Sequence, residues 1–591
     1  MEEVTRNTLE AAHRPDDTAT TAVADGDVPA PLQLVVQSRL NRWPRFAAIV
    51  QSAAVLGRDF SKQLLERIVP PSYGTEVTDT IEVLAREGLF ADPRSGSRER
   101  VRFKHVMICD AVYNTLLGSD RQRLHSEVAD ILSRDYKGTP DATPDVVADH
   151  LRKARRFVEA IRVRLSESAY TVTRRAYVET EGHCLAALSL VDEVQDRAER
   201  TALQFRLLIQ LGVALTGRHG YSAAVVEDAY RRAHAVCGDK AEAEMLYPIM
   251  RGLAAVNLVR GNLATAYELS VQGLQLAEQS KRIEFRIDAL SMLCYTTLYY
   301  GRLEDCHAWI DRCLQLYHAE QGHSLTYPVP QDAGTSAMAL LPTVAWLLGD
   351  VQGAEDAVRD GLAHVDRLNS DFDRAFLHSW IAGARYTQRR YGEALEHAGF
   401  AVMISQQHGY REWYGTGALM ALLAKSALQA DPQSIAQATA ACMEFAREGV
   451  GLNASYYLWG LARGHAQAGD VETARHMLGE AFRRADASRE TRMNPELLIL
   501  QAELEPDDAR ATELLRTALA LAEEHGAVPT VLRAAAALAI RSNTDDAGIA
   551  RATLDALDAR SAYPTESNWM LERSTALKRT LNTPDRPMVQ A

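Results

Sequence analysis

Three segments of the chain combine aromatic and polar residues in a way that suits a binding surface. Aromatic side chains offer a large apolar area with a polar edge, and carboxamide and carboxylate groups add hydrogen bonds. At helical spacing, however, aromatic residues more often pack in a core, so a packing role is the alternative for each of them. The residues that we expect to contact a protein partner or a small ligand are Tyr221, Tyr327, Gln331, Asp332, Tyr410 and Trp413.

The second of these segments, residues 323–337, interrupts an otherwise regular helical pattern. Its sequence is HSLTYPVPQDAGTSA, which contains two prolines and a glycine. Long loops inside compact domains tend to be functional, because connecting segments carry binding residues more often than the elements they join. The sequence leaves open whether this insertion is a ligand-binding loop or a structural brace.

The usual catalytic patterns are missing from the sequence. It contains no GxxxxGK[ST] phosphate loop, GxGxxG, HExxH or GxSxG pattern. His125-Ser-Glu127 lacks the downstream PCxxC that a zinc deaminase requires. We therefore predict no catalytic or cofactor-binding residue in this chain, and no enzymatic activity for the chain by itself.

Seven cysteines are scattered along the chain and form no CxxC pair. Cys306, His307 and Cys313 invite interpretation as a metal site. Because Cys306 and Cys313 are seven residues apart, they fall on one helix face, where cysteine behaves as a small apolar residue. We prefer this packing interpretation, and predict neither a metal site nor a disulfide framework.

Composition excludes several further classes of protein. Of the 591 residues, 47% are hydrophobic, which is ordinary for a globular protein, and the formal net charge is -13. A negative field opposes non-specific nucleic-acid binding, so we regard nucleic acid as an improbable partner. No apolar run is long enough for a membrane span, and the N-terminus does not resemble a secretory signal. We expect a cytoplasmic protein without membrane contact.

A recurring pattern in the second part of the chain indicates helical repeats. A turn glycine or arginine is followed two residues later by an apolar residue and three residues after that by a small one. The apolar and small pairs are Leu263 with Ala266, Leu303 with Cys306, Val351 with Ala354, Tyr391 with Ala394, and Val471 with Ala474. The small residue permits close helix approach, which is typical of helix hairpins of the tetratricopeptide kind. Such arrays form superhelices that bind peptides, proteins or small ligands.

The first part of the chain has a different pattern. Apolar spacing predicts helices at 32–42, at 46–56, after Ser61 and at 75–87, followed by short extended pieces at 89–91 and 101–103. Helices followed by a hairpin are the layout of a winged helix. The last of these helices carries four carboxylates against one arginine, so DNA reading by this module is disfavoured.

The predicted fold class is therefore all-α, with a tetratricopeptide-like (TPR-like) superhelix preceded by a small winged-helix domain with a short β-hairpin. We assign residues 31–120 to the winged helix, 121–580 to about ten helix pairs, and 581–591 to a disordered tail. Residues 1–30 combine a short helical stretch with a polar loop.

Several short sequence motifs along the chain resemble those of one known group of proteins. They are PLQ at 31–33 with SRL at 38–40, AVLGRDF at 54–60, FKH with DAVY between 103 and 113, GYS at 220–222, and QDAG at 331–334. With these phrases the chain resembles the C-terminal half, winged helix plus TPR-like region, of bacterial signal-transduction ATPases and class III adenylate cyclase multidomain proteins. The resemblance implies a sensor arm that regulates a signalling NTPase or cyclase module.

The first residues, EEVTR at 2–6, resemble the phrase that closes the NTPase module of this family. By that resemblance, residues 1–30 are the remnant of the last NTPase helix and loop, and the nucleotide-binding residues would lie upstream. By this resemblance, either the sequence is a truncated form of a longer protein or the gene encodes a stand-alone arm. The leading hypothesis is a non-catalytic sensor or scaffold, whose partner is the NTPase or cyclase module, in cis or in trans, or a small ligand. The alternatives are the tail of a longer adenylate cyclase or ATPase, and a TPR-containing transcriptional regulator.

Overall fold

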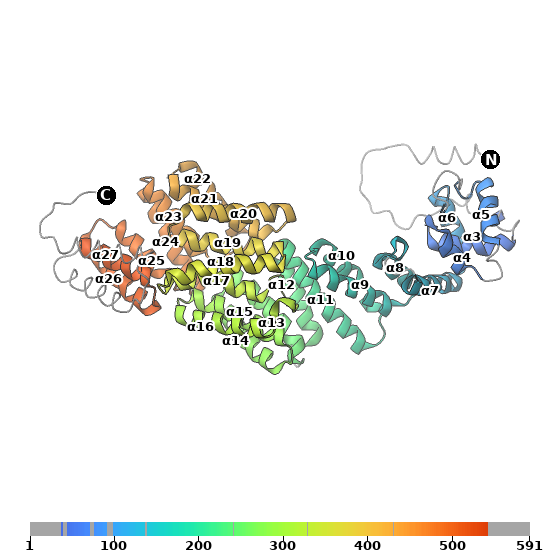
Figure 1. Cartoon of the computed structure of the whole chain (residues 1–591), viewed down its shortest axis with the longest axis horizontal. Coiled ribbons are helices and arrows are strands. Elements are labelled where there is room, and N and C mark those ends of the chain that lie inside the picture. The colour runs from blue at the N-terminus through green and yellow to red at the C-terminus, as the bar shows by residue number, and fades with distance from the viewer. Residues whose placement is uncertain are drawn as a thin grey trace. The chain divides into compact units, whose positions relative to one another are not determined.

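The computed structural model places helices along almost the whole described chain (Figure 1). Two compact units divide the molecule, one of residues up to Val163 and one from Arg164 onward. The predicted NTPase remnant, most of the predicted helix 32–42 and the predicted tail lie outside the described residues. The residues described are 37–38, 44–70, 76–91, 99–135, 139–239, 241–327, 329–429 and 431–541.

The first unit is a helical bundle with one small sheet. Ser61 starts α4 as predicted, because its hydroxyl accepts a hydrogen bond from Leu64 N at 3.3 Å. The predicted helices at 46–56 and 75–87 correspond to α3 and α5. The bounds are α3 (Pro44–Leu56), β1 (Asp59–Ser61), α4 (Lys62–Ile68), α5 (Val77–Arg86), β2 (Arg100–Arg102), α6 (Val106–Asn114), α7 (Gly118–Asp135), η3 (Pro140–Ala142) and α8 (Pro144–Lys153).

The sheet of this unit pairs β1 with β2 in antiparallel register, with Phe60 opposite Val101. The two predicted extended pieces are joined by an isolated bridge between Phe90 and Phe103. Strand β1 was not predicted, because three residues between a helix end and a helix cap are too few to show alternation. Three phenylalanine rings, those of Phe60, Phe90 and Phe103, pack with centroids 4.8 to 6.3 Å apart and anchor the sheet on the core.

Two of the basic side chains of the hairpin are held by carboxylates. Arg100 and Arg102 donate to the Asp59 carboxylate at 2.6 and 2.8 Å, and Arg100 also donates to Asp141 at 2.9 Å. Their charge is thus partly neutralised within the unit. The winged-helix assignment itself stays a prediction.

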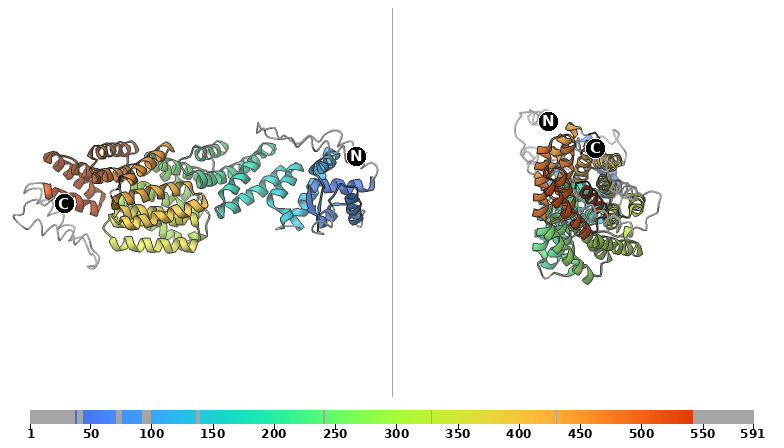
Figure 2. Two further views of the ribbon diagram at one scale, coloured as in Figure 1. Left: turned by 90° about the horizontal axis from the view of Figure 1, so that it is seen from above. Right: turned by 90° about the vertical axis from the view of Figure 1, so that its left-hand side faces the viewer.

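The second unit is a run of antiparallel helix hairpins, which Figure 2 shows from two further sides. The boundary between the units falls within α9 (Phe157–Thr173). The following elements are α10 (Tyr177–Leu188), η4 (Val191–Glu193), α11 (Arg197–His219), α12 (Ala224–Cys237), α13 (Ala243–Val259), α14 (Leu263–Gln279), α15 (Ile283–Tyr299), α16 (Leu303–Ala319), η5 (Gly322–Ser324), α17 (Ala333–Leu347), α18 (Val351–Leu368), α19 (Asp371–Thr387), α20 (Tyr391–His408), α21 (Arg411–Gln429), α22 (Pro432–Arg447), α23 (Ala454–Gln467), α24 (Val471–Ser488), α25 (Asn494–Glu503), α26 (Asp508–His525) and α27 (Val528–Arg541).

The predicted repeat pattern is confirmed, because each apolar residue in it is the first residue of the second helix of a hairpin. The small residues three positions later are fully buried where the two helices meet: Ala266, Cys306, Ala354, Ala394 and Ala474. The turn glycines take positive φ values, for example +81° at Gly261 and +93° at Gly349, a conformation that favours glycine. The fold is therefore all-α, and unit 2 is a TPR-like helical-repeat superhelix.

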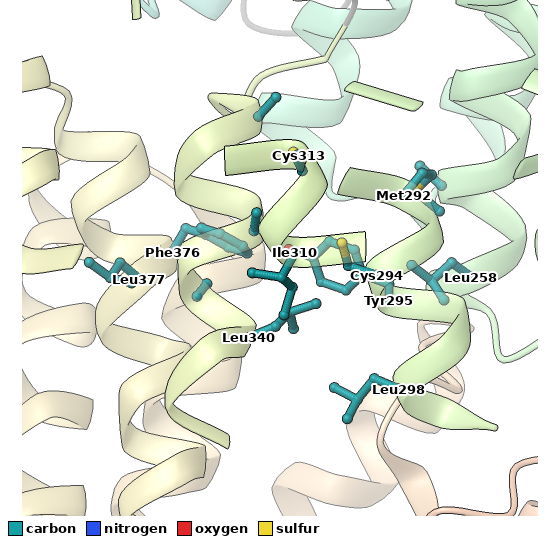
Figure 3. Close-up of a cluster of buried hydrophobic side chains, with 14 of the residues drawn as sticks. Leu258, Met292, Cys294, Tyr295, Leu298, Ile310, Cys313, Leu340, Phe376 and Leu377 are labelled. Carbon is teal, nitrogen blue, oxygen red and sulfur yellow. The ribbon is translucent and has the colours of Figure 1, made fainter. Parts of the chain in front are cut away.

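One buried hydrophobic cluster of this superhelix extends over several successive hairpins. Figure 3 shows Leu258 of α13, Met292 and Tyr295 of α15, Leu340 of α17 and Phe376 of α19 in one buried cluster.

Cysteines of α16 belong to the same core. Cys306 and Cys313 are fully buried, and their thiols lie 3.1 and 3.4 Å from the carbonyl oxygens of Cys294 and Ile287 in α15. Burial raises the pKa of the Cys306 thiol to about 12, so it stays a neutral packing group. His307, by contrast, lies in the outer part of α16, 3.3 Å from Asp311.

Successive turns of the superhelix lie in direct contact. The carbonyl oxygen of Val259, at the end of α13, accepts hydrogen bonds from Gly451 N and Leu452 N, each at 2.9 Å, just before α23 begins. The carbonyl oxygen of Tyr299, at the end of α15, accepts in the same way from Thr491 N and Arg492 N, at 3.1 and 3.2 Å, just before α25. Each of these two helices thus ends against the start of the helix that comes ten helices later in the chain: α13 against α23, and α15 against α25. We call these contacts the seam.

Candidate functional site

A cavity opens inside the superhelix, where the first helices of successive hairpins face one another. Its volume is about 130 Å³, and it is partly open to solvent. Its walls come from α13, α15, α17, α19, α21 and α23, together with the turns at residues 219–222 and 450–453. Because the seam joins consecutive superhelical turns, helices far apart in sequence contribute to one wall. We call this space the central cavity.

Aromatic rings form much of the cavity wall. Phe376 and Trp380 of α19 lie between Trp413 of α21 and Tyr295 of α15. The centroid of Phe376 lies 5.0 Å from that of Trp413, and the centroid of Trp380 lies 5.4 Å from that of Tyr295, both in edge-to-face orientation. Such ring pairs stabilise the wall beyond the area they bury. Their faces and edges present an apolar surface to a ligand.

Arg251 brings a buried positive charge to one side of the central cavity. Its Nε lies 3.0 Å from both carboxylate oxygens of Asp288, and Tyr247 donates to the same carboxylate at 2.7 Å. Burial alone would lower the pKa of Arg251, but Asp288 and the neighbouring tyrosines raise it above its usual value. The guanidinium therefore stays charged, although it is 6% exposed.

Arg492 also lines the cavity, at the seam between α15 and α25. Its guanidinium lies 5.3 Å from the ring centroid of Tyr299 and 5.6 Å from that of Tyr456, which is cation–π geometry. It also donates to Asn453 Oδ1 at 3.2 Å. The rings of Tyr299 and Tyr456 fix the position of the guanidinium group in the cavity wall.

Tyr221 and Glu412 connect the two superhelical turns at the mouth formed by α11 and α21. The backbone N–H of Tyr221 donates to Glu412 Oε2 at 2.9 Å, across 191 residues of sequence. Its hydroxyl donates to Gln331 Oε1. Burial raises the pKa of Glu412 to about 7, although the hydrogen bond from Tyr221 opposes this shift. Glu412 is thus a group in the lining that titrates near neutral pH.

The six predicted site residues divide between two cavities. Tyr221, Gln331 and Trp413 line the central cavity. A second cavity, of about 480 Å³, is lined by Tyr327, Asp332 and Tyr410, and again by Gln331. All six residues are more than nine-tenths buried, so they are wall residues and contribute to packing as well.

Asp332 is used mainly to hold the fold together. Its carboxylate caps α17 by accepting from Thr335 N at 2.7 Å, and it also accepts from the Tyr317 hydroxyl at 3.0 Å. Its backbone N–H donates to Asp373 Oδ1 at 2.8 Å, and Arg175 donates to the other oxygen of Asp373 at 3.2 Å. The insertion around Gln331 is therefore braced by hydrogen bonds at this end, and its last residues, 333–337, already belong to α17.

Sequence reasoning did not find several residues of the central cavity. Arg251, Tyr295 and Trp380 lie on α13, α15 and α19, and Arg492 lies in the turn before α25. The three helical residues sit at ordinary helical spacing and Arg492 in an ordinary turn, so nothing local distinguishes them from surface arginines or core aromatic residues. Within the described ranges, no three His, Cys, Asp or Glu side chains are grouped so as to hold a metal ion.

None of the described helices is long and apolar enough to cross a membrane. The residues that line the central cavity all belong to unit 2.

Comparisons with known proteins give distant similarities. No protein-family model matches the chain. An uncharacterized protein of Rhizobium meliloti (strain 1021) is 22% identical over 512 residues, which are 85% of this chain and 49% of that protein. The chain thus spans about half the length of the curated relative that it matches.

Two solved structures illustrate the structural similarities. A Rap protein complexed with competence and sporulation factor has a TM-score of 0.42 at 12% identity, over 67% of this chain and 99% of the other. A signal transduction ATPase with numerous domains and a tetratricopeptide repeat sensor, from Pyrococcus horikoshii, has a TM-score of 0.42 at 11% identity, over 78% of this chain and 65% of the other.

Proposed function

We propose that this chain is a non-catalytic sensor arm, which takes a peptide or small ligand into the central cavity. The observation that carries the proposal is the cavity itself, which has a volume of about 130 Å³, an opening to solvent, aromatic walls and a few fixed polar groups. Ligand sites are typically concave, mostly apolar and provided with a small number of polar groups that orient the ligand. A ligand in this cavity would touch both superhelical turns at once.

The partner of the arm belongs to the same proposal. We propose that the arm regulates a signalling NTPase or cyclase module, in cis or in trans. Two facts support this: the phrases of the sequence that resemble such proteins, and a curated relative about twice as long as the stretch it shares with this chain. A ligand regulates such a module only if it binds the superhelix more tightly in one state of the arm than in another.

A thermal-shift screen with a cavity-blocking variant tests ligand binding. Thr416 lines the central cavity and is only half-buried, so Thr416→Trp is expected to fold while filling part of the space. Peptides and small molecules that raise the Tm of the wild-type chain should fail to raise that of the variant. Ligands that stabilise both proteins equally, or a broad library without any hit, would contradict the proposed site.

A second measurement addresses the absence of catalysis. The purified chain, incubated with ATP and Mg²⁺, is expected to release no phosphate and to form no cyclic nucleotide above the buffer rate. Phosphate release or cyclic-nucleotide formation that co-purifies with the protein would contradict the non-catalytic assignment and favour the alternative of an enzyme.

A further inference from the structure

Helix α22 packs on its neighbours through its first half only. Ile435 and Ala438 are buried, but of residues 439–447, all of which the structure describes, none is buried. The second helices of the neighbouring hairpins differ, because α20 and α24 bury residues as far along as Ser405 and Ala485. The second half of α22 therefore leaves space beside α23 and α24.

This space is a cavity of about 250 Å³, lined by residues of α22, α23 and α24 and partly open to solvent. We call it the α22–α24 cavity. Much of its lining is apolar: Leu458, Leu461 and Met477 belong to the buried core, and Met443 of α22 is 52% exposed beside them. Since an apolar cavity of about 150 Å³ in a protein interior can bind benzene, this one has room for about one or two rings.

The acidic residue and the arginine of this lining neutralise each other. Glu480 and Arg484, one turn apart on α24, form an ion pair with Oε1 and Nε 2.7 Å apart. The Thr439 hydroxyl is also in use, because it donates to the carbonyl oxygen of Ile435 at 2.9 Å. A charged ligand would lose hydration here against an already paired lining, whereas an uncharged apolar ligand gains from leaving water.

The α22–α24 cavity and the central cavity share part of their walls. Phe445, Val450, Leu452 and Tyr457 line both. The rings of Phe445 and Tyr457 meet edge-to-face with their centroids 6.4 Å apart. Leu452 also belongs to the seam, since its N–H donates to the carbonyl oxygen of Val259. A ligand in the α22–α24 cavity would therefore touch side chains that also line the central cavity.

We infer that the α22–α24 cavity is a second binding site, which takes a small, uncharged, apolar molecule. Bound there, such a molecule packs against Phe445, Leu452 and Tyr457 and restrains the wall shared with the central cavity. A volume of about 250 Å³ suits a small molecule, but a helix of a protein partner, about 10–12 Å across with its side chains, would not fit. The inference goes beyond the proposed function, because it concerns a different cavity and requires no ligand in the central one.

Toluene and benzoate have nearly the same shape and differ in charge, so they test the site. Calorimetric titration of the full chain should show toluene binding, and benzoate binding at least about tenfold more weakly, since its carboxylate would lose hydration in an apolar space. Cys442→Phe fills part of the cavity and should weaken toluene by at least about tenfold as well. Ala440→Phe is the matched control, because it places the same ring at an exposed position of α22 outside the lining. It should bind toluene as the wild type does.

The Cys442 thiol reports occupancy of the cavity in the wild-type chain. Cys442 lines the cavity and is half-buried, as is Cys237 of α12, whereas the other five cysteines are buried. Toluene at about ten times its Kd should slow alkylation of Cys442 by iodoacetamide about tenfold, by mass action, and leave Cys237 unchanged. Mass spectrometry measures both rates. Amide exchange at residue 452 should slow in the same sample, because the ligand restrains Leu452.

The possible outcomes separate the two cavities. Toluene binding that Thr416→Trp abolishes and Cys442→Phe leaves intact would place the ligand in the central cavity, which overturns this inference and supports the proposed function. Equal affinity for benzoate would overturn the uncharged class of ligand. Unchanged alkylation of Cys442 by toluene-saturated protein would overturn the site, and unchanged exchange at residue 452 would overturn the restraint of the wall.

Two further results are decided in advance. If Cys442→Phe does not fold, the alkylation of the wild type decides the question. If toluene does not bind, this inference fails, and the proposed function is decided separately by its thermal-shift screen.

Discussion

At the scale of single residues, buried ionisable groups make the stability of this protein depend on pH. His125 and His150 in unit 1 contact each other through their Nδ1 atoms at 2.8 Å, and the Tyr113 hydroxyl lies 2.9 Å from His125 Nε2. Burial lowers the pKa of His125 to about 3 and that of His150 to about 4. Both imidazoles are therefore neutral in the folded protein at neutral pH, and a proton on either would be buried without compensation.

The histidine pair predicts that unit 1 loses stability in acid. Unfolded histidine binds protons below about pH 6.5, while the folded pair does not, so the free energy of unfolding decreases as pH falls below that value. At pH 5 the loss is about 2 kcal/mol for each histidine. Hydrogen exchange of α7 and α8 in the full chain, compared at pH 5 and pH 7.5 after correction for intrinsic rates, should show it. A double His125→Gln and His150→Gln variant should lose this dependence on pH, even if it is less stable throughout.

Glu412, at the contact between Tyr221 and α21, predicts the opposite dependence on pH. Its pKa is raised in the folded state, so the folded protein holds a proton that the unfolded chain has released, and stability falls as pH rises from about 4.5 through 7. Glu412→Gln should therefore gain stability relative to the wild type between pH 5 and pH 8, by at most about 3 kcal/mol. Urea unfolding at the two pH values measures the difference. An equal difference at both values would show that Glu412 is ionised throughout.

At the scale of helices, close packing depends on glycines that face aromatic rings. The Tyr230 ring of α12 lies between Gly212 of α11 and Gly252 of α13. A Cβ atom on Gly252 would lie 2.3 Å from Tyr230 Cζ, and one on Gly212 would lie 2.8 Å from it. These two glycines, rather than any special backbone angle, allow three consecutive helices to approach one another around a large buried ring.

Gly252→Ala is therefore expected to destabilise the chain by about 1–3 kcal/mol, as overpacking of a filled core does. Gly399→Ala in α20 is the control, because nothing lies within 4 Å of its Cβ position. There the substitution should stabilise the helix by about 0.5–1 kcal/mol, since alanine is the better helix former. Urea unfolding of both variants measures the contrast, and equal effects would contradict this account of the helix packing.

At the scale of the whole repeat array, the seam joins consecutive turns of the superhelix beside the central cavity. Gly451 lies so close to the preceding superhelical turn that a Cβ atom there would be 2.3 Å from the carbonyl oxygen of Arg260. The neighbouring hydrogen bonds to Val259 hold the same place. An opening of the cavity between α13 and α23 would have to break these contacts.

Gly451→Ala should therefore separate the two turns at this point. We expect a lower Tm and faster amide exchange at residues 451 and 452, whose N–H groups donate to Val259. Gly392→Ala, in a position where a Cβ atom meets nothing within 4 Å, should leave both unchanged. Unaltered exchange at residues 451 and 452 would mean that the seam does not constrain the wall.

The sequence by itself determined the helices, the hairpins and their turns. These features follow from local rules: apolar periodicity places Leu263 and Val351 at helix starts, and positive φ selects glycine at 261 and 349. Strand β1 escaped these rules, because its pairing with β2 is made across 41 residues and leaves no local trace.

The tertiary structure alone decided which residues share a cavity. Tyr221 and Trp413 meet in one wall, whereas Tyr327 and Tyr410 belong to another, although all four looked alike in sequence. The physical reason is that the superhelix closes through small rotations added from hairpin to hairpin. The contact of Tyr221 with Glu412 joins residues that are 191 positions apart. Such a contact depends on the total rotation added up over all the intervening hairpins, and no single segment of the sequence encodes it.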